Sequence, residues 1–371
     1  MAVPRRCVRR PSRHLALTGA TAVAVLIVIG AVAVSGFSFG SRRTAPTGWS
    51  PRAWPPVAAA GRDAGCDRVA SARGSDRNGG TQAAPMRTAQ ALARALRPGQ
   101  TGCLRGGTYR GGQYVLSLWH PGRRGAPITI RNYPGERARL LGITQVRPTA
   151  RWIVLSGLYF EGDGSQNTIK VYGSDITVER SDITNRRRGL SCVLLGSVQE
   201  GAAVRPVLRR NHLHDCGDPA HGNKDHGIYA AYTAGGRISR NYFADSSGYA
   251  IQFYPNAQHT RFDHNVVDGD GDSMRGGIVF GGAFGHASSD NLVEHNVIAY
   301  AATYGVTANW EGPPGAGNVV RDNCFWGSRE ADVDRPFGFS ASANVVADPQ
   351  FRDRARGDLR MPANRCRQVL R

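Results

Sequence analysis

One polar stretch in the middle of the chain gathers the residue types that catalysis uses. Residues 212–229 hold four of the ten histidines and one of only two lysines, Lys224. Lysine and histidine can act as general bases, and tyrosine can act as an acid. The same residue types are also common in turns, and Asp225 and His226 could form a buried hydrogen-bonded pair. Residues 212–229 therefore form either a catalytic site or ordinary turns. Which other residues lie beside them depends on the fold.

An internal repeat indicates which distant residues become neighbours. A short β-prone run ends in a polar residue and then an asparagine, and copies aligned on that last position are spaced 24 to 31 residues apart. They occur at Gly157, Ser181, Asn211, Asn241, Asn265, Asn296 and Asn323. Short strands that recur at this period and stack on one another form a solenoid. We expect the repeated asparagines to form a hydrogen-bonded ladder between coils.

A second β-prone element recurs inside each period. Its copies begin at Gly227, Ala250, Gly277 and Gly305. No apolar pattern of helix length lies between them, which excludes a sheet built from βαβ units. An antiparallel sandwich would not produce this register. The sequence therefore predicts an all-β fold, a right-handed parallel β-helix of eight to ten coils over residues 104–350.

Motifs near the start of this region carry a family resemblance. They are Gly-Ser-Asp-Arg-Asn-Gly-Gly-Thr at 74–81, an Ala/Leu-rich run at 88–96 stopped by Pro98-Gly99, and Arg-Gly-Gly-Thr-Tyr at 105–109. With them the sequence resembles the pectin-lyase-like superfamily of right-handed β-helix proteins, specifically exported bacterial members, over roughly residues 66–350. The resemblance implies a capping α-helix near 86–97. It implies no single activity, because the superfamily includes lyases, hydrolases, epimerases, esterases and non-enzymes.

Aligned positions on successive coils lie ~4.8 Å apart. His226 then aligns with Tyr249, Gly276 and Tyr304, and Asp225 aligns with Arg275. We expect one solvent-accessible groove with catalytic Lys224, His226, Arg275 and Tyr229, and substrate-binding Tyr249, Gln252, Tyr304 and Asp225. Aromatic rings and basic groups along a groove suit an extended sugar chain that carries carboxylates.

The favoured chemistry is lysis or epimerisation of a polyuronate by abstraction of the C5 proton. β-Helix lyases that this chain resembles use Lys or Arg as the base, with Ca²⁺ or Arg at the substrate carboxylate. Here Lys224 or His226 would be the base, Arg275 would hold the carboxylate, and Tyr229 or Tyr249 would be the acid. Two alternatives stay open: a non-catalytic module that binds cell-envelope glycan, and a glycoside hydrolase that uses Asp215, Asp245 and Asp225. Whether the protein is an enzyme is not decided by the sequence.

Carboxylates suggest one metal site. Asp215 and Asp245 are expected to stack on adjacent coils, near an Asp-Gly run at 268–272 that contains Asp270. Two carboxylates so close need a cation or a shared proton. The sequence therefore offers a Ca²⁺ site at Asp215, Asp245 and Asp270, or turns that use the arginines at 186–188 as counter-charge.

The net charge of +19 is unevenly distributed. Residues 1–60 carry eight Arg and no acid, residues 66–150 carry fourteen Arg and three acids, and residues 151–371 carry 24 basic and 24 acidic groups. No basic groove-facing element, zinc-finger motif or RNA-binding motif accompanies the charge, which argues against nucleic acid as a partner. The basic stretch at 105–147 would attract an anionic polymer.

The N-terminus predicts export. A basic segment at 1–14 precedes an apolar run at 15–39, which is either a transmembrane anchor or a signal segment cleaved near Ala31-Val32-Ala33. A Pro/Ala/Gly-rich linker at 40–65 follows, and then a β-helix domain at 66–371. We expect either a single-pass cell-membrane protein with an extracellular domain or a secreted protein, in both cases a monomer.

Cysteine usage agrees with export. Cys7 lies in the basic segment, and the six other cysteines make an even number in the exported part. Sequential pairing would link local regions, as Cys66–Cys103, Cys192–Cys216 and Cys324–Cys366.

Overall fold

The computed structural model describes residues 65–222, 224–269, 276–334 and 336–371. No helix among these residues has the length and apolarity needed to cross a membrane. The predicted anchor or signal segment at 15–39 and nearly all of the linker lie outside the described residues, as do Cys7, Asp270 and Arg275.

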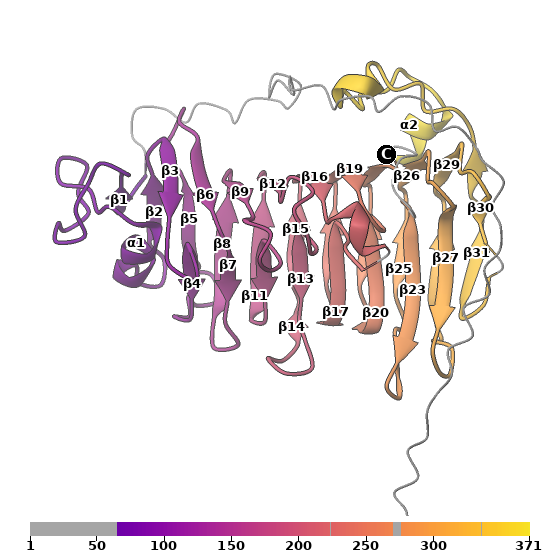
Figure 1. Cartoon of the computed structure of the whole chain (residues 1–371), viewed down its shortest axis with the longest axis horizontal. Coiled ribbons are helices and arrows are strands. Elements are labelled where there is room, and N and C mark those ends of the chain that lie inside the picture. The colour runs from indigo at the N-terminus through magenta and orange to yellow at the C-terminus, as the bar shows by residue number, and fades with distance from the viewer. Residues whose placement is uncertain (1–64, 223, 270–275, 335) are drawn as a thin grey trace, which may run out of the picture. The chain divides into compact units, whose positions relative to one another are not determined.

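The described residues form a parallel β-helix whose coils each contribute up to three short strands (Figure 1). The strands stack into three faces. The first face holds β4 (Leu116–Leu118), β7 (Thr144–Val146), β10 (Ile169–Val171), β13 (Val193–Leu195), β17 (Ile228–Ala234), β20 (Ile251–Gln258), β23 (Ile278–Ala283), β27 (Tyr304–Trp310) and β30 (Ala331–Val333). The second holds β1 (Arg68–Ala70), β2 (Thr101–Leu104), β5 (Ile128–Asn132), β8 (Arg151–Ser156), β11 (Ser174–Glu179), β15 (Val207–Arg209), β18 (Arg237–Ser239), β21 (Arg261–Asp263), β25 (Leu292–Glu294), β28 (Asn318–Arg321) and β31 (Phe339–Ser342).

The third face is a separate sheet of ten strands. It holds β3 (Gly107–Arg110), β6 (Ala138–Leu141), β9 (Tyr159–Glu161), β12 (Asp182–Thr184), β16 (His212–Cys216), β19 (Tyr242–Ser246), β22 (Val266–Asp268), β26 (Val297–Ala299), β29 (Cys324–Trp326) and β32 (Val345–Val346). Two short strands, β14 (Ala203–Val204) and β24 (His286–Ala287), belong to loops at the margin of the first two faces. The ten-strand stack confirms the expectation of eight to ten coils.

Apolar side chains fill the inside of the coils because every second residue of a strand points inward. The inward positions of successive coils form columns, and Phe253 and Phe280 stack there with ring centroids 5.1 Å apart. The core is continuous from Leu92 beneath the first coil to Phe339 in the last. Each coil therefore buries its apolar side chains only against its neighbours, as expected of a solenoid.

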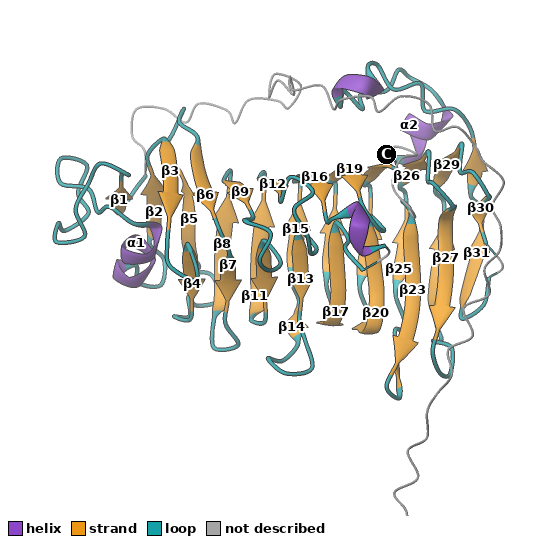
Figure 2. Cartoon of the chain, in the orientation of Figure 1, coloured by secondary structure: helices purple, strands orange, loops and turns teal. Residues whose placement is uncertain are grey.

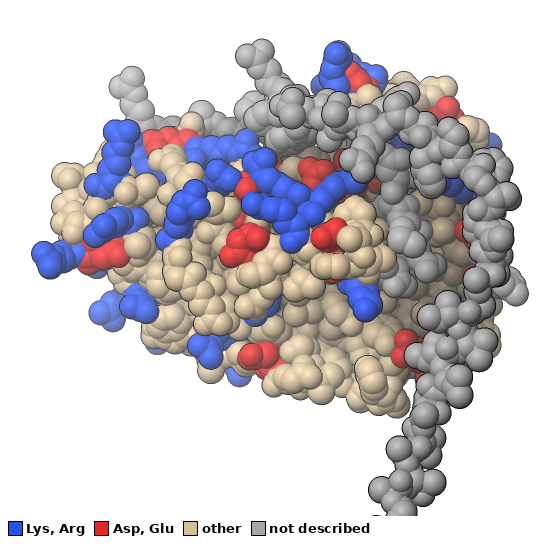
Figure 3. Space-filling model, viewed as in Figure 1, with Lys and Arg blue, Asp and Glu red and all other residues tan. Residues whose placement is uncertain are grey.

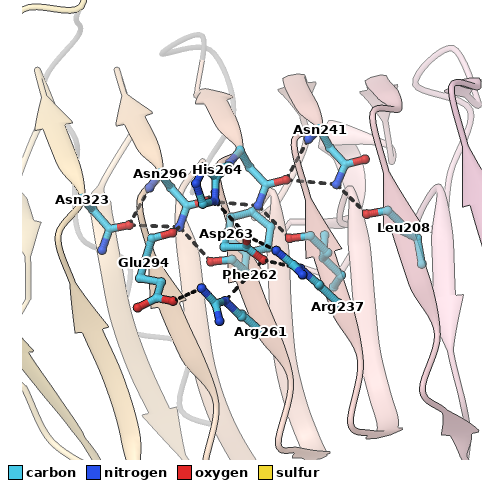
Figure 4. A network of polar contacts seen from close by, with 12 residues as sticks. Leu208, Arg237, Asn241, Arg261, Phe262, Asp263, His264, Glu294, Asn296 and Asn323 are labelled. Atoms are coloured by element: carbon cyan, nitrogen blue, oxygen red, sulfur yellow. Dashed lines mark hydrogen bonds and ion pairs between the residues drawn. The ribbon is translucent and has the colours of Figure 1, made fainter. Parts of the chain in front are cut away.

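The asparagine ladder is present and buried (Figure 4). The amide oxygen of Asn265 accepts from the backbone N–H of Asn241 at 2.9 Å, and Asn265 in turn donates to the amide oxygen of Asn296 at 3.0 Å. Asn211, Asn323 and Asn344 extend the same pattern. The residue before each asparagine has a positive φ, for example 55° at Arg240, so the ladder fixes a sharp turn between the second and third faces.

The N-terminal end of the solenoid is covered by a helix, and the C-terminal segment packs on its side. The helix α1 (Ala89–Ala95) begins at Thr88, whose side chain accepts from the Ala91 N–H, and its Leu92 is fully buried against the first coil. At the other end the chain turns back, and the helix α2 (Arg365–Val369) packs over the third face (Figure 1). Apart from these two helices and short 3₁₀ turns, the described chain is strand and loop (Figure 2). The cap predicted near 86–97 is thus confirmed, in a shorter form.

The three predicted disulfides are confirmed. Cys66 and Cys103 join the first strands, Cys192 and Cys216 join adjacent coils, and Cys324 and Cys366 hold α2 to the third face. Their Cα–Cα distances are 5.7, 5.3 and 5.1 Å, within the usual range. Three disulfides indicate that this part of the chain folds in an oxidising compartment outside the cytoplasm.

Candidate functional site

The predicted register of the first face is correct. Ile228 pairs with Ile251, Ile251 with Ile278, and Ile278 with Val306, so His226 aligns with Tyr249 one coil on and with Tyr304 three coils on. The prediction that His226 and Tyr249 line a solvent-accessible groove is nevertheless wrong, because these two residues are only 1% and 4% exposed. Register alone does not show which side of the sheet a strand-entry residue occupies.

Asp225 and His226 form buried structure rather than a surface site. A carboxylate oxygen of Asp225 accepts from the Asp218 N–H at 3.0 Å and lies 2.8 Å from His221 Nδ1. The Nδ1 of His226 accepts from the Tyr249 N–H at 3.1 Å. Burial lowers the pKa of His226 to about 4, although Asp225 and Gln252 oppose the shift. His226 is therefore neutral near pH 7 and does not reach solvent in the described structure.

The structure does not test whether the other predicted catalytic residues meet. Lys224 is exposed on the loop before β17, whereas Arg275 and the metal candidate Asp270 lie outside the described residues. Their predicted roles stay predictions. Tyr229, Gln252 and Tyr304 are all half-buried, and Tyr229 and Gln252 are directly paired on β17 and β20.

Tyr229 and Gln252 belong to one outward-facing column that runs along the first face. Followed toward the N-terminus, it passes through the paired residues Leu194, Lys170, Gln145 and Ser117. Next to this column Tyr254 stacks on Tyr229 with ring centroids 6.4 Å apart, and its hydroxyl donates to Glu311 at 3.1 Å. Aromatic and polar side chains thus line the outer surface of the first face over several coils.

Lys170 is the chemically most unusual residue of this column. It lies on β10, is only 9% exposed, donates to the amide oxygen of Gln166, and has its ammonium 5.5 Å from the centre of the Tyr114 ring. Desolvation lowers the pKa of Lys170, although the carboxylate of Glu200 opposes the shift. Beside it, burial raises the pKa of Tyr172 to about 12. A lysine held in this way is more easily deprotonated than an exposed one.

An open cleft of about 610 Å³ extends from Tyr114, the residue whose ring lies near the Lys170 ammonium, to the capping helix, and Lys170 itself is not among its lining residues. Tyr114 forms its wall on the Lys170 side, and Arg94 of α1 lies 5.5 Å from the Trp119 ring centre. The remaining lining residues are Gln90, Gln113, Ser117 and Arg147. Gln90 is fixed by two hydrogen bonds to the Ser117 backbone, of 2.7 and 3.0 Å, so the helix is docked onto β4. The lining is basic and aromatic, and none of these described residues is acidic.

This cleft was not predicted from the sequence. Lys170 lies in a coil that precedes the first clear copies of the repeat, so it was not aligned with the later coils. Two signals pointed to Lys170: it is one of only two lysines, and the strand Ile169-Lys170-Val171 places it between two inward apolar residues. Arg94 and Trp119 join the cleft through the docking of α1, which no repeat predicts.

The acidic pair behaves as counter-charged turn structure. Asp215 and Asp245 both have positive φ and lie on adjacent coils, as predicted. Arg187 lies between them, with its guanidinium nitrogens 3.5 Å from each carboxylate. Arg187 therefore provides the counter-charge of these two carboxylates, which is the second of the two alternatives left open by the sequence.

Two other groups could hold a metal by composition. They are Asp182, His212 and His214, and Glu294, His295 and Asp322. In the first, His214 lies between Asp182 and Asp215 at 2.9 and 2.7 Å. Burial opposes its protonation, but these two carboxylates outweigh burial and raise the pKa of His214 to about 9. Without a metal ion the first group therefore forms an ion-pair network near pH 7, and a metal bound there would have to displace the proton of His214.

Arginine ion pairs connect neighbouring coils at the third face. The buried Glu161 is bound by three of them, Arg139, Arg186 and Arg188, at 2.7 to 3.1 Å. Basic side chains gather toward this edge in the space-filling view, interleaved with acidic ones (Figure 3). These ion pairs join neighbouring coils, so their role is structural.

Comparison with known proteins agrees with this architecture. A curated relative, the uncharacterised protein YwoF of Bacillus subtilis (strain 168), is 39% identical over 72 residues. That match covers 19% of this chain and 15% of the relative, so it concerns a small part of either protein.

Solved structures share the fold at low identity. Pectate lyase Pel9A superposes with a TM-score of 0.58 at 16% identity, over 76% of this chain and 77% of its own. An alginate lyase from Paenibacillus sp. str. FPU-7 gives 0.55 at 15% identity, over 75% and 95%. A glycoside hydrolase gives 0.50 at 10% identity, over 80% and 99%. The expected pectin-lyase-like fold is therefore confirmed, and these likenesses show the fold alone.

The family model of the right-handed β-helix region matches residues 149–344. This segment is more than half of the chain and covers the coils with the asparagine ladder. The chain belongs to the right-handed β-helix family.

Proposed function

We propose that this protein binds an anionic polysaccharide in the cleft beside Lys170 and cleaves it as a lyase. The observation that carries the proposal is Lys170 itself, a nearly buried lysine with a lowered pKa, whose ammonium lies 5.5 Å from the ring centre of Tyr114, and Tyr114 lines a basic and aromatic cleft. Such perturbed groups in clefts mark functional sites. Tyr229, Gln252 and Tyr304 lie farther along the same face and would extend the contact with a long chain.

Each part of the reaction has a candidate group. Arg94 and Arg147 would bind and neutralise the uronate carboxylate, which acidifies the proton on C5. The neutral amine of Lys170 would take that proton. The electrons left on C5 would form the C4–C5 double bond as the C4–O bond breaks, and the Tyr114 hydroxyl would protonate the departing oxygen.

The lining of the cleft argues against hydrolysis. Glycoside hydrolases use a pair of carboxylates that flank the bond to be cleaved. None of the described residues lining the cleft is acidic, and the aspartates considered from the sequence lie elsewhere: Asp215 and Asp245 on Arg187, and Asp225 in the interior.

A non-catalytic glycan-binding role is the second candidate. The carboxylate of Glu200 favours the charged form of Lys170, and a charged lysine would bind a uronate without deprotonating it. Three disulfides, which fit a protein outside the cytoplasm, are compatible with either role.

The chain has only two lysines, and this permits a direct test. The purified protein is incubated with a panel of polyuronates, with and without a chelator, and unsaturated uronate is followed by its absorbance. We expect product, its loss in Lys170→Met, and a rate that rises with pH toward a midpoint below 10.5, the ordinary lysine value.

Lys170→Arg and Lys224→Met are the matched variants. Lys170→Arg keeps the charge but replaces the amine with a guanidinium, which loses its proton far less readily, so it should retain binding and lose most of the activity. Loss of activity in Lys224→Met alone would instead support the base expected from the sequence. Binding without product from any polyuronate would favour the glycan-binding role.

A further inference from the structure

Three arginines form a row at the turn between the second and third faces. Arg180, Arg210 and Arg240 each follow the last residue of a second-face strand, and we call them the arginine row. The Arg180 N–H donates to the Arg209 carbonyl, and the Arg210 N–H donates to the Ser239 carbonyl, both at 3.1 Å. The three residues are therefore aligned on successive coils, about 4.8 Å apart.

The charge of the row is not neutralised by its surroundings. All three residues are exposed, and within the described part of the chain their side chains make no hydrogen bond, ion pair or ring contact. The nearest acidic groups along the second face are already paired: Glu179 with Arg209, and Asp263 with Arg237 at 3.0 Å. The row is therefore a line of three positive charges open to solvent.

Backbone geometry does not explain the arginines. Their φ angles are 49°, 55° and 55°, a left-handed conformation that suits Gly, Asn and Asp better than a long side chain. Like charges at this spacing also repel one another. Arginine at three successive turn positions is thus unfavourable for the isolated fold on both counts, whereas it would be favourable with a bound anion.

We propose that the arginine row binds a linear anionic polysaccharide running along the axis of the solenoid. The row presents charges at one regular spacing, and a polymer with repeated carboxylates presents the complementary pattern. It lies at the turn between the second and third faces, whereas the cleft of Lys170 opens on the first, so it is a separate surface. It would hold a polymer whether or not the cleft cleaves it.

A polysaccharide fits the row better than a nucleic acid does. The three disulfides place this part of the chain in an oxidising compartment. Single-stranded nucleic acids are bound by aromatic rings on which bases stack, and no Tyr, Trp or Phe occupies the row or its continuation at His264 and His295.

The test replaces the row with a residue that suits its backbone. In the triple variant Arg180→Asn, Arg210→Asn, Arg240→Asn, the charge is lost while a left-handed turn is still favoured. The matched control is Arg97→Gln, Arg123→Gln, Arg124→Gln, which removes the same charge from exposed arginines elsewhere. Both are made in the Lys170→Met protein, so that cleavage cannot obscure binding, and equilibrium binding of polygalacturonate is measured against salt.

We expect the row variant to bind polygalacturonate about tenfold more weakly, or about 1.4 kcal/mol, with a shallower salt dependence, and the control to bind like its parent. Fully methyl-esterified polygalacturonate should bind weakly to all three proteins. Equal losses in the row variant and the control, or no loss in either, would overturn the proposal. So would a loss seen with duplex DNA but not with polygalacturonate. When the row is replaced in a protein that retains Lys170, short oligouronates should still be cleaved. Failure of the lyase proposal and failure of this one are therefore distinguishable.

Discussion

Replacing Asn265 with alanine should destabilise the solenoid strongly, because this side chain holds three coils together. Its oxygen accepts from the backbone N–H and the amide of Asn241, and its amide donates to the Ile238 carbonyl and to Asn296. Asn265, Asn241 and Ile238 are all 0% exposed. Water therefore cannot replace the lost partners.

The magnitude follows from the groups left without a partner. In Asn265→Ala the Asn241 N–H and the Ile238 carbonyl lose their hydrogen bonds to this side chain, whereas the neighbouring amides keep other partners. The Ile238 carbonyl keeps its ladder hydrogen bond to β21, whereas the buried Asn241 N–H is left without a partner. A buried orphan costs about 1–3 kcal/mol and the lost hydrogen bond to Ile238 about 1 kcal/mol, so the free energy of unfolding should fall by about 2–4 kcal/mol. The last asparagine of the ladder, Asn344, is partly exposed, and Asn344→Ala should cost only about 1 kcal/mol because solvent can reach the groups it leaves.

Guanidinium unfolding with the disulfides intact, followed by circular dichroism, compares the two variants with the parent. Equal destabilisation by Asn265→Ala and Asn344→Ala would refute the reasoning, because the difference rests on burial alone.

Other predictions concern the disulfides, the histidines and the cleft. Replacing Cys192 and Cys216 by serine should lower the free energy of unfolding by about 3 kcal/mol, since the pair closes a loop of 24 residues; denaturant titration checks this, and an unchanged midpoint would contradict it. The folded-state pKa of His214 is about 9 and that of an unfolded histidine about 6.5, so its contribution is complete below pH 6.5 and is lost as the pH rises through 9. Stability of the parent should therefore fall between pH 7 and pH 10 by at most about 3 kcal/mol, and His214→Gln should lack that fall. Arg94→Gln should raise KM for a polyuronate about tenfold with a smaller effect on kcat, and an unchanged KM would remove Arg94 from the site.

The repeat made most of the fold predictable. A recurring asparagine at a period of 24 to 31 residues fixes coil length, and a cysteine on each of two adjacent coils, Cys192 and Cys216, can then be paired from register. The stacking of Asp215 on Asp245 followed in the same way. These features depend only on the position along a coil.

The candidate site was less predictable, because it depends on side-chain direction and on segments outside the repeat. His226 has the expected neighbours but points into the protein, and its register is the same in either orientation. The cleft depends on how α1 docks on β4, through Gln90 and the Ser117 backbone, and a contact of this kind leaves no periodic signal in the sequence.

Hydrogen–deuterium exchange in the presence of a short oligouronate tests the central claim most directly, because it locates the ligand without requiring turnover. If the cleft beside Lys170 is the site, the amides of residues 113–119, 145–147 and 170–172 should exchange more slowly with ligand, and Lys170→Met should weaken that protection. Protection confined to residues 221–229 around Lys224, with none at β4, β7 and β10, would contradict the assignment of the site.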